Sequence, residues 1–94
     1  MLEPWRPDHV RRLLRILLGA GGEIRFSRHA LDEMRQDYLT TVDCANVLRA
    51  GVLEPGELVS GTWRYRVRTS RICVVIAFRS ERECLVVTAW RFVR

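Results

Sequence analysis

Apolar residues near the start of the chain recur three and four positions apart. Between Pro7 and Gly21-Gly22 this spacing predicts an amphipathic helix with Asp8 as its N-cap. The opposite side of this helix is basic and carries Arg11, Arg12 and Arg15. A solvated helix face is the interpretation that we favour for these arginines, and direct contact with phosphate groups is the alternative.

The next segment combines a short strand with two short helices. Residues 23–26 (EIRF) alternate polar and apolar side chains, which predicts a strand at the edge of a sheet. Ser27 is a suitable N-cap for a helix that continues to Gln36. Thr40-Thr41 cap a third helix, which ends at Gly51.

After Gly51 the apolar pattern changes to a period near two. Four strands are predicted, over residues 52–59, 62–69, 71–79 and 83–92. Because the turns are short, neighbouring strands must be antiparallel. Strand 71–79 (RICVVIAFR) is apolar on both faces and is expected at the centre. The predicted fold class is α+β, with N-terminal helices packed on a four- to five-stranded antiparallel sheet.

The length of the chain leaves room for one hydrophobic core. At 94 residues we expect a single domain over residues 1–94. Its parts are an N-terminal helix in 1–22, a short strand and two helices in 23–51, and an antiparallel meander in 52–94. The first residues lack the apolar core of a signal peptide, and the apolar runs are too short to span a membrane.

The three cysteines lie within apolar runs and do not form a C-x-x-C pair. They are Cys44, Cys73 and Cys84. This pattern predicts buried thiols that stay reduced, and therefore a cytoplasmic protein.

The charge balance is strongly basic. The chain has 16 basic and 11 acidic residues, a net charge of +5 at pH 7, and every basic residue is an arginine. A coding bias can explain the absence of lysine, but it does not explain the net excess of positive charge. Arginine grips phosphate through two parallel hydrogen bonds and stacks on bases. The excess therefore favours a nucleic acid or an acidic protein as partner.

Strand 62–69 (TWRYRVRT) alternates strictly between two kinds of side chain. Trp63, Tyr65 and Val67 are expected on one face, and Arg64, Arg66 and Arg68 on the other. A row of guanidinium groups repels itself unless anions lie across it, and a polynucleotide backbone supplies such anions. The alternative is an exposed strand whose arginines pair with glutamates such as Glu54, Glu57 or Glu83.

Two further positions carry side chains that are suited to binding or catalysis. Trp90-Arg91 places an aromatic ring and a cation at the end of the last strand, where a base can stack. Because the neighbours of Trp90 are apolar, we favour a core position for Trp90 and a functional role for Arg91.

His29 opens the second helix, whose N-terminal dipole favours a neutral imidazole that can accept a proton. It is a candidate general base or acid, and a surface or capping histidine is the alternative.

The sequence lacks the motifs that other kinds of active site and metal site require. There are too few histidines and no paired cysteines for zinc, and neither a P-loop nor a G-x-S-x-G motif is present. We therefore expect no metal and no cofactor. Cleavage of RNA by its own 2′-hydroxyl requires only a base, an acid and cations that stabilise the phosphorane.

Four segments together carry a resemblance to a known family. They are F-S-R-H-A-L-D-E-M (26–34), N-V-L-R-A-G (46–51), G-T-W-R-Y-R-V (61–67) and V-V-T-A-W-R (86–91). In these segments the sequence resembles the DUF4258 family, which is related to the RelE, BrnT and motility quorum-sensing regulator toxins of bacterial toxin–antitoxin pairs. Glu33 and Asp37 depart from the arginines that many family members carry after the His-Ala pair.

The resemblance implies a RelE/barnase-like fold and a metal-independent ribonuclease that a cognate antitoxin protein neutralises. On that basis the candidate catalytic residues are His29, Arg64, Arg66 and Arg91. The candidate residues for contact with RNA are Arg28, Tyr65, Arg68 and Trp90. The alternative function is a non-catalytic module that binds RNA or a protein through the same surface.

Overall fold

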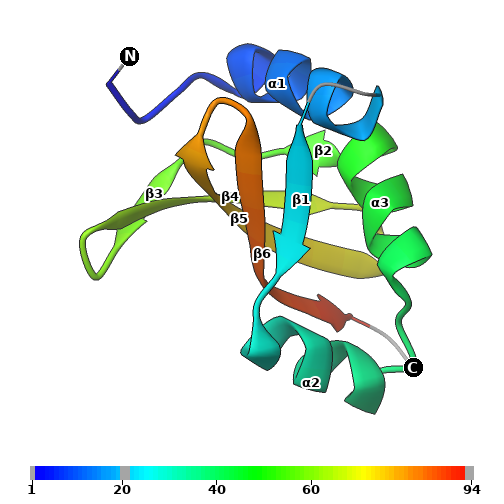
Figure 1. Cartoon of the computed structure of the whole chain (residues 1–94). Coiled ribbons are helices and arrows are strands. Elements are labelled where there is room, and N and C mark those ends of the chain that lie inside the picture. Colours follow the sequence, from blue (N-terminus) through cyan, green and yellow to red (C-terminus); the bar gives the residue numbers. More distant parts are fainter. Residues whose placement is uncertain (1, 20–21, 93–94) are drawn as a thin grey trace.

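The structure is a computed structural model that describes residues 2–19 and 22–92 (Figure 1). In these residues, three helices pack on an open, mostly antiparallel sheet of six strands, which is an α+β fold. The elements in chain order are α1 (Pro7–Gly19), β1 (Glu23–Phe26), α2 (Arg28–Gln36), α3 (Thr41–Ala50), β2 (Val52–Leu53), β3 (Glu57–Val59), β4 (Thr62–Arg68), β5 (Ile72–Ser80) and β6 (Glu83–Arg91).

The helices form where the apolar spacing predicts them. α2 begins after Ser27, whose hydroxyl accepts a backbone N–H of the first turn at 3.0 Å. α3 begins after Thr40, which forms a capping box with Asp43. The N-cap predicted at Asp8 is wrong, because α1 already starts at Pro7. Proline suits the first helical position, where its missing N–H would have no helical partner.

The end of α1 was predicted at Gly21-Gly22, and the described helix ends at Gly19. Gly21 lies outside the described residues.

None of the helices in the described ranges is long and apolar enough to cross a membrane.

The sheet has the strand order β1-β6-β5-β4-β2. The sixth strand, β3, is not part of this order and pairs with β4. β5 is central and β1 lies at an edge, as predicted. The single strand predicted over residues 52–59 is wrong, because Pro55-Gly56 separates β2 from β3 and proline has no N–H to continue a ladder. β1 runs parallel to β6, so the sheet is not wholly antiparallel.

One face of the sheet, here called the helix face, packs against the helices (Figure 1). Its core joins Leu14 of α1 and Leu48 of α3 to Tyr65 of β4 and Ile76 of β5. α2 packs against β6 at one end of the sheet. On the other face, β5 buries Cys73, Val75 and Ala77. Burial on both faces explains why the sequence of β5 is almost continuously apolar.

Arg11 shows that part of the basic side of α1 has a structural role. Its guanidinium group donates hydrogen bonds to the carbonyl oxygens of Leu48 (2.6 Å), Arg49 (2.9 Å) and Gly51 at the end of α3. These carbonyls have no partner within the helix, and a cation complements the negative end of the helix dipole. Arg12 and Arg15 are exposed, which agrees with a solvated face for these two residues.

All three cysteines lie in the described part of the chain and are buried free thiols, as predicted. Burial raises the pKa of the Cys84 thiol from its ordinary value of 9.0 to about 12. The folded state therefore disfavours the thiolate that the unfolded chain forms above pH 9.

We expect this thiol to make the protein less stable in alkali. A group with a raised pKa contributes stability that is complete below its unfolded pKa and is lost as the pH rises toward the folded pKa. For Cys84 this window runs from pH 9 to about 12. Within it, the contribution of Cys84 to the free energy of unfolding should fall by about 1.4 kcal/mol per pH unit. Urea unfolding from pH 7 to 11 checks this expectation. Cys84→Ala should show a shallower decline, and identical slopes would contradict it.

Candidate nucleic-acid interface

β4 presents its arginines on the face of the sheet opposite the helices. Tyr65 and Val67 are fully buried in the core. Trp63 is half-buried against the same core. Arg64 is half-buried, and Arg66 and Arg68 are exposed. The predicted alternation along β4 is therefore confirmed. The sheet surface that carries Arg64, Arg66 and Arg68 is called the arginine face below.

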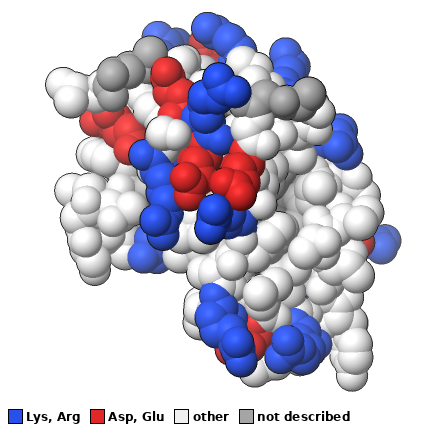
Figure 2. Space-filling model, in the orientation of Figure 1, with Lys and Arg blue, Asp and Glu red and all other residues white. Residues whose placement is uncertain are grey.

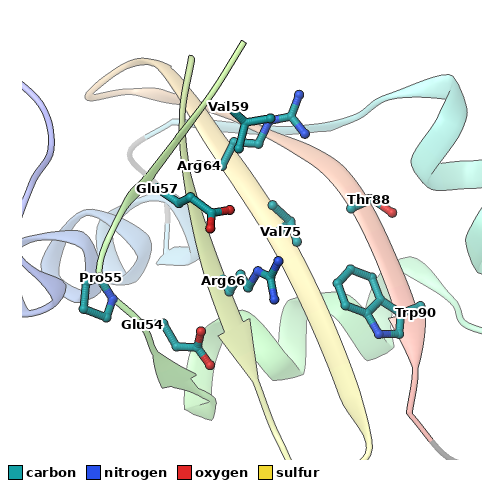
Figure 3. A pocket seen from close by; sticks show the side chains of 9 residues that line it. All are labelled: Glu54, Pro55, Glu57, Val59, Arg64, Arg66, Val75, Thr88 and Trp90. Carbon is teal, nitrogen blue, oxygen red and sulfur yellow. The ribbon is translucent and has the colours of Figure 1, made fainter. Parts of the chain in front are cut away.

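A pocket of about 350 Å³ opens on the arginine face (Figure 3). Its walls come from β3, β4, β5, β6 and the loop between β2 and β3, and no helix contributes to them. The lining residues are Glu54, Pro55, Glu57, Val59, Arg64, Arg66, Val75, Thr88 and Trp90. The pocket exists because β3 pairs with the same strand, β4, that carries the arginines. The break at Pro55-Gly56 lets the chain turn into that position.

Two glutamates share the pocket with the arginines. Glu54 accepts a hydrogen bond from Nε of Arg68 at 2.5 Å, so the predicted alternative of pairing with a glutamate is confirmed for Arg68. Glu57 lies directly across from Arg64 in the pairing of β3 with β4. In Figure 3 the Glu57 carboxylate points into the pocket, toward the side where Arg66 lies. The sequence had suggested Glu57 only as an ion-pair partner, because its position beside the pocket depends on how β3 folds back.

Neither Arg64 nor Arg66 forms an ion pair with a carboxylate of the described residues, whereas Arg68 of the same strand pairs with Glu54. Nε of Arg64 is buried and has no hydrogen-bond partner within the described part of the chain. Buried N–H groups in proteins are nearly always hydrogen-bonded to protein, water or a bound molecule. The two guanidinium groups are therefore suited to bind an anion that enters the pocket.

Trp90 forms the wall of the pocket on β6. Its side chain is half-buried, and its ring contacts Phe92 edge to face, with 6.2 Å between the ring centroids. The core position that we favoured for Trp90 is wrong, because Trp90 pairs with Cys73 on the arginine face of the sheet. In Figure 3 the indole faces the space in front of Arg66. Its predicted role in stacking on a base remains a prediction.

The structure does not bring His29 to the pocket. His29 is exposed on the first turn of α2, and its Nε2 lies 3.0 Å from Oε1 of Glu33. Arg28 is also exposed and pairs with Asp32 at 3.5 Å. Neither residue lines the pocket, because α2 packs at the end of β6 and not over the arginine face. A proton-transfer role for His29 together with Arg64 and Arg66 therefore has no geometric basis here.

Arg91 also points away from the pocket. Its guanidinium group donates to the carbonyl oxygens of Asp37 (3.2 Å) and Tyr38 (3.4 Å), just after α2. Its backbone N–H donates to the buried carboxylate of Asp37 at 2.8 Å. Arg91 thus ties the end of α2 to β6, and its cation complements the negative end of the helix dipole. The catalytic role predicted for Arg91 would require a different arrangement of this side chain.

The RNA contact predicted for Tyr65 is wrong, because its ring is completely buried on the helix face. The Tyr65 hydroxyl accepts a hydrogen bond from the backbone N–H of Trp5 (3.0 Å) and donates one to Glu3 (2.8 Å). Burial raises the pKa of Tyr65 to about 12. This tyrosine therefore anchors the N-terminal segment to the core.

Several other arginines lie beside acidic residues. In the view of Figure 2, mixed charge covers β1 and β6, where Arg25 lies 3.2 Å from Glu23 and 3.7 Å from Glu83. A second mixed cluster covers α2, where Arg28 and Arg35 each approach Asp32 at 3.5 Å. Exposed pairs of this kind contribute little to stability, but they lower the local positive potential. Arg64 and Arg66 differ from these arginines in lacking such pairs.

The chain matches no protein-family model, no curated protein and no solved structure. Within the described residues, no three His, Cys, Asp or Glu side chains are grouped so that they could hold a metal ion.

Proposed function

We propose that the chain binds RNA through the pocket on the arginine face and cleaves it there without a metal ion. The observation that carries the proposal is the presence of Arg64, Arg66, Glu57 and Trp90 around one pocket. These residues come from three different strands, and together their side chains suit the phosphate, the ribose 2′-hydroxyl and the base of a nucleotide.

The pocket groups match the parts of a single-stranded nucleotide. A guanidinium group binds phosphate through two parallel hydrogen bonds, which suits Arg64 and Arg66. An indole ring stacks on an unpaired base, and such stacking contributes about 1–3 kcal/mol per base. A volume of about 350 Å³ lies within the range of ordinary ligand pockets. The pocket therefore suits one nucleotide of a single strand better than a base-paired duplex.

Glu57 supplies the group that cleavage requires in addition to the arginines. In the proposed reaction its carboxylate accepts the proton of the ribose 2′-hydroxyl. The 2′-oxygen then bonds to phosphorus, and the bond from phosphorus to the 5′-oxygen breaks, which leaves a 2′,3′-cyclic phosphate. The leaving 5′-oxygen takes a proton from water, and the resulting hydroxide takes the proton held by Glu57, which restores the carboxylate. Arg64 and Arg66 stabilise the negative charge of the phosphorane. Glu57 thus takes the role of proton acceptor that the sequence had suggested for His29.

The cellular setting of the proposal follows the family resemblance. Such a ribonuclease would act in the cytoplasm as the toxin of a toxin–antitoxin pair. Its cognate antitoxin would be a protein that covers the arginine face, because covering this face would exclude RNA from the pocket. The net charge of +5 favours an acidic partner.

Binding to single-stranded RNA should weaken steeply as salt increases, because phosphates neutralised by arginine release their counterions. Arg66→Ala should lower the slope of log Kd against log salt by about one unit. Arg12→Ala, which removes an exposed arginine of α1, is the matched control and should leave the slope unchanged. Fluorescence anisotropy at several salt concentrations measures both. Binding that is equally strong at low and high salt would contradict the proposal and indicate a protein partner.

A further inference from the structure

Glu54 lines the pocket but has no part in the proposed cleavage reaction. It follows β2, and its backbone N–H donates to the carbonyl oxygen of Arg66 at 3.0 Å. This bond continues the pairing of β2 with β4 by one residue, before Pro55 ends the ladder. Because Leu53 packs against the core on the helix face, alternation places the Glu54 side chain on the arginine face. The backbone of Glu54 is therefore fixed beside the pocket.

The carboxylate of Glu54 has one oxygen that is bound and one that is available. Oε2 accepts a hydrogen bond from Nε of Arg68 at 2.5 Å. Within the described residues, Oε1 has no hydrogen-bond partner. In Figure 3 the carboxylate points toward the side of the pocket where Arg66 lies. Arg68 does not line the pocket itself, so it holds from behind an acceptor that the pocket presents.

An acceptor at this place requires a donor from the bound nucleotide. The carboxylate of Glu54 repels phosphate groups, and its exposed ion pair with Arg68 adds little to stability. The ribose 2′-hydroxyl is already assigned to Glu57. The bases differ in what they offer, because adenine and cytosine carry an amino group that donates. Uracil has a carbonyl oxygen at the position of the cytosine amino group, and this oxygen cannot donate to a carboxylate.

We propose that Glu54 selects a base that carries an amino group, and so favours cytosine over uracil, for the nucleotide bound in the pocket. This inference rests on the proposed RNA binding and adds the kind of base to it. Glu54 and Trp90 line the same pocket from opposite sides of Arg66 (Figure 3). A base stacked on the indole fills the space in front of Arg66, where its hydrogen-bonding edge can meet Glu54. In this arrangement Arg68 is a positioning residue, because it holds the carboxylate and does not contact the base.

The test compares oligocytidine with oligouridine of equal length, by fluorescence anisotropy. The two bases have the same ring size, so a difference in affinity reports the hydrogen-bonding edge and not the stacked area. The wild type should bind oligocytidine roughly 5-fold or more tightly, the lower end of the discrimination that a contact to a base edge gives. Glu54→Gln should abolish the preference, because an amide group both donates and accepts. It should also bind oligouridine more tightly than the wild type does, because a negative charge is removed.

Two further variants separate selection from charge. Arg68→Gln should reduce the preference for oligocytidine, because the carboxylate of Glu54 loses the partner that fixes it. Glu23→Gln removes a carboxylate that pairs with Arg25 outside the pocket lining, and the preference should be unchanged. A purely structural role of Glu54 would change the affinity for both strands by the same factor and leave their ratio as it is.

The outcomes distinguish this inference from the proposed function. If the wild-type chain binds neither strand, the proposed function fails and the inference fails with it. If the wild type binds both strands equally or prefers oligouridine, and Arg66→Ala weakens that binding, RNA binding stands and only the selection by Glu54 is overturned. A Glu54→Gln protein that keeps the preference for oligocytidine would overturn it as well.

Discussion

Glu57→Gln is expected to slow metal-free cleavage of RNA by about 10²- to 10⁴-fold, the usual contribution of a general acid or base. Glutamine keeps the size and polarity of the side chain but cannot accept the proton of the 2′-hydroxyl. Because Glu57 lies across from Arg64, removing its negative charge should leave RNA binding unchanged or slightly stronger. The expected signature is therefore a loss of turnover without a loss of affinity. Gel assays of RNA cleavage in EDTA, with anisotropy for binding, measure the two quantities.

Two matched variants make this experiment decisive. Glu23→Gln removes an exposed carboxylate of β1 that is remote from the pocket lining, and cleavage should be unaffected. His29→Ala should also retain cleavage, because His29 pairs with Glu33 outside the pocket. Loss of cleavage in His29→Ala together with normal cleavage in Glu57→Gln would reverse the assignment. If the wild-type protein binds RNA but leaves it intact, the chain is a non-catalytic RNA-binding module, and the role proposed for Glu57 is wrong.

Trp5→Ala should lower the free energy of unfolding by about 3–5 kcal/mol, the usual cost of removing a large buried aromatic side chain. Trp5 is 8% exposed, stacks parallel to Tyr65 at 6.4 Å and contacts Phe78 edge to face at 5.1 Å between ring centroids. Small domains have only about 5–15 kcal/mol of net stability, so this loss is a large share of the total. Urea unfolding followed by circular dichroism measures it.

Trp5→Phe is the control for this prediction. It keeps an aromatic ring in the same place and removes the indole N–H, which is buried and has no hydrogen-bond partner within the described residues. Because no hydrogen bond is lost, we expect a cost below about 1.5 kcal/mol, close to that of a conservative core exchange. A cost below about 1 kcal/mol for Trp5→Ala would show that the N-terminal segment is not part of the core in solution.

The N-terminal segment also illustrates a limit of sequence analysis. The first seven residues are interrupted by two prolines and two charged side chains, so they predict neither a helix nor a strand. In the structure, the Trp5 ring belongs to the core and its backbone N–H donates to the Tyr65 hydroxyl, 60 positions further along the chain. Such a contact depends on the folded position of β4, and the local pattern contains no signal for it.

The spacing of residues along the chain correctly predicted the features whose physical cause acts within a few residues. The caps at Ser27 and Thr40 act within one helical turn, so α2 and α3 begin where the sequence predicts. The alternation along β4 places Tyr65 and Arg66 on opposite faces because successive residues of any strand point in opposite directions. The candidate site was therefore half predicted, since the sequence identified Arg64 and Arg66 and the face that carries them.

The sequence by itself determined the class of fold, the three helices, the central position of β5 and the face of the arginines, because these depend on periodicity and on neighbours in the chain. Only the tertiary structure decided which side chains meet. It placed Glu57 and Trp90 in the pocket, turned Arg91 toward α2 and left His29 outside, because β3 folds back on β4 and α2 packs at the end of β6. These contacts join residues far apart in the chain, and their geometry follows from the packing of whole elements, which no local pattern contains.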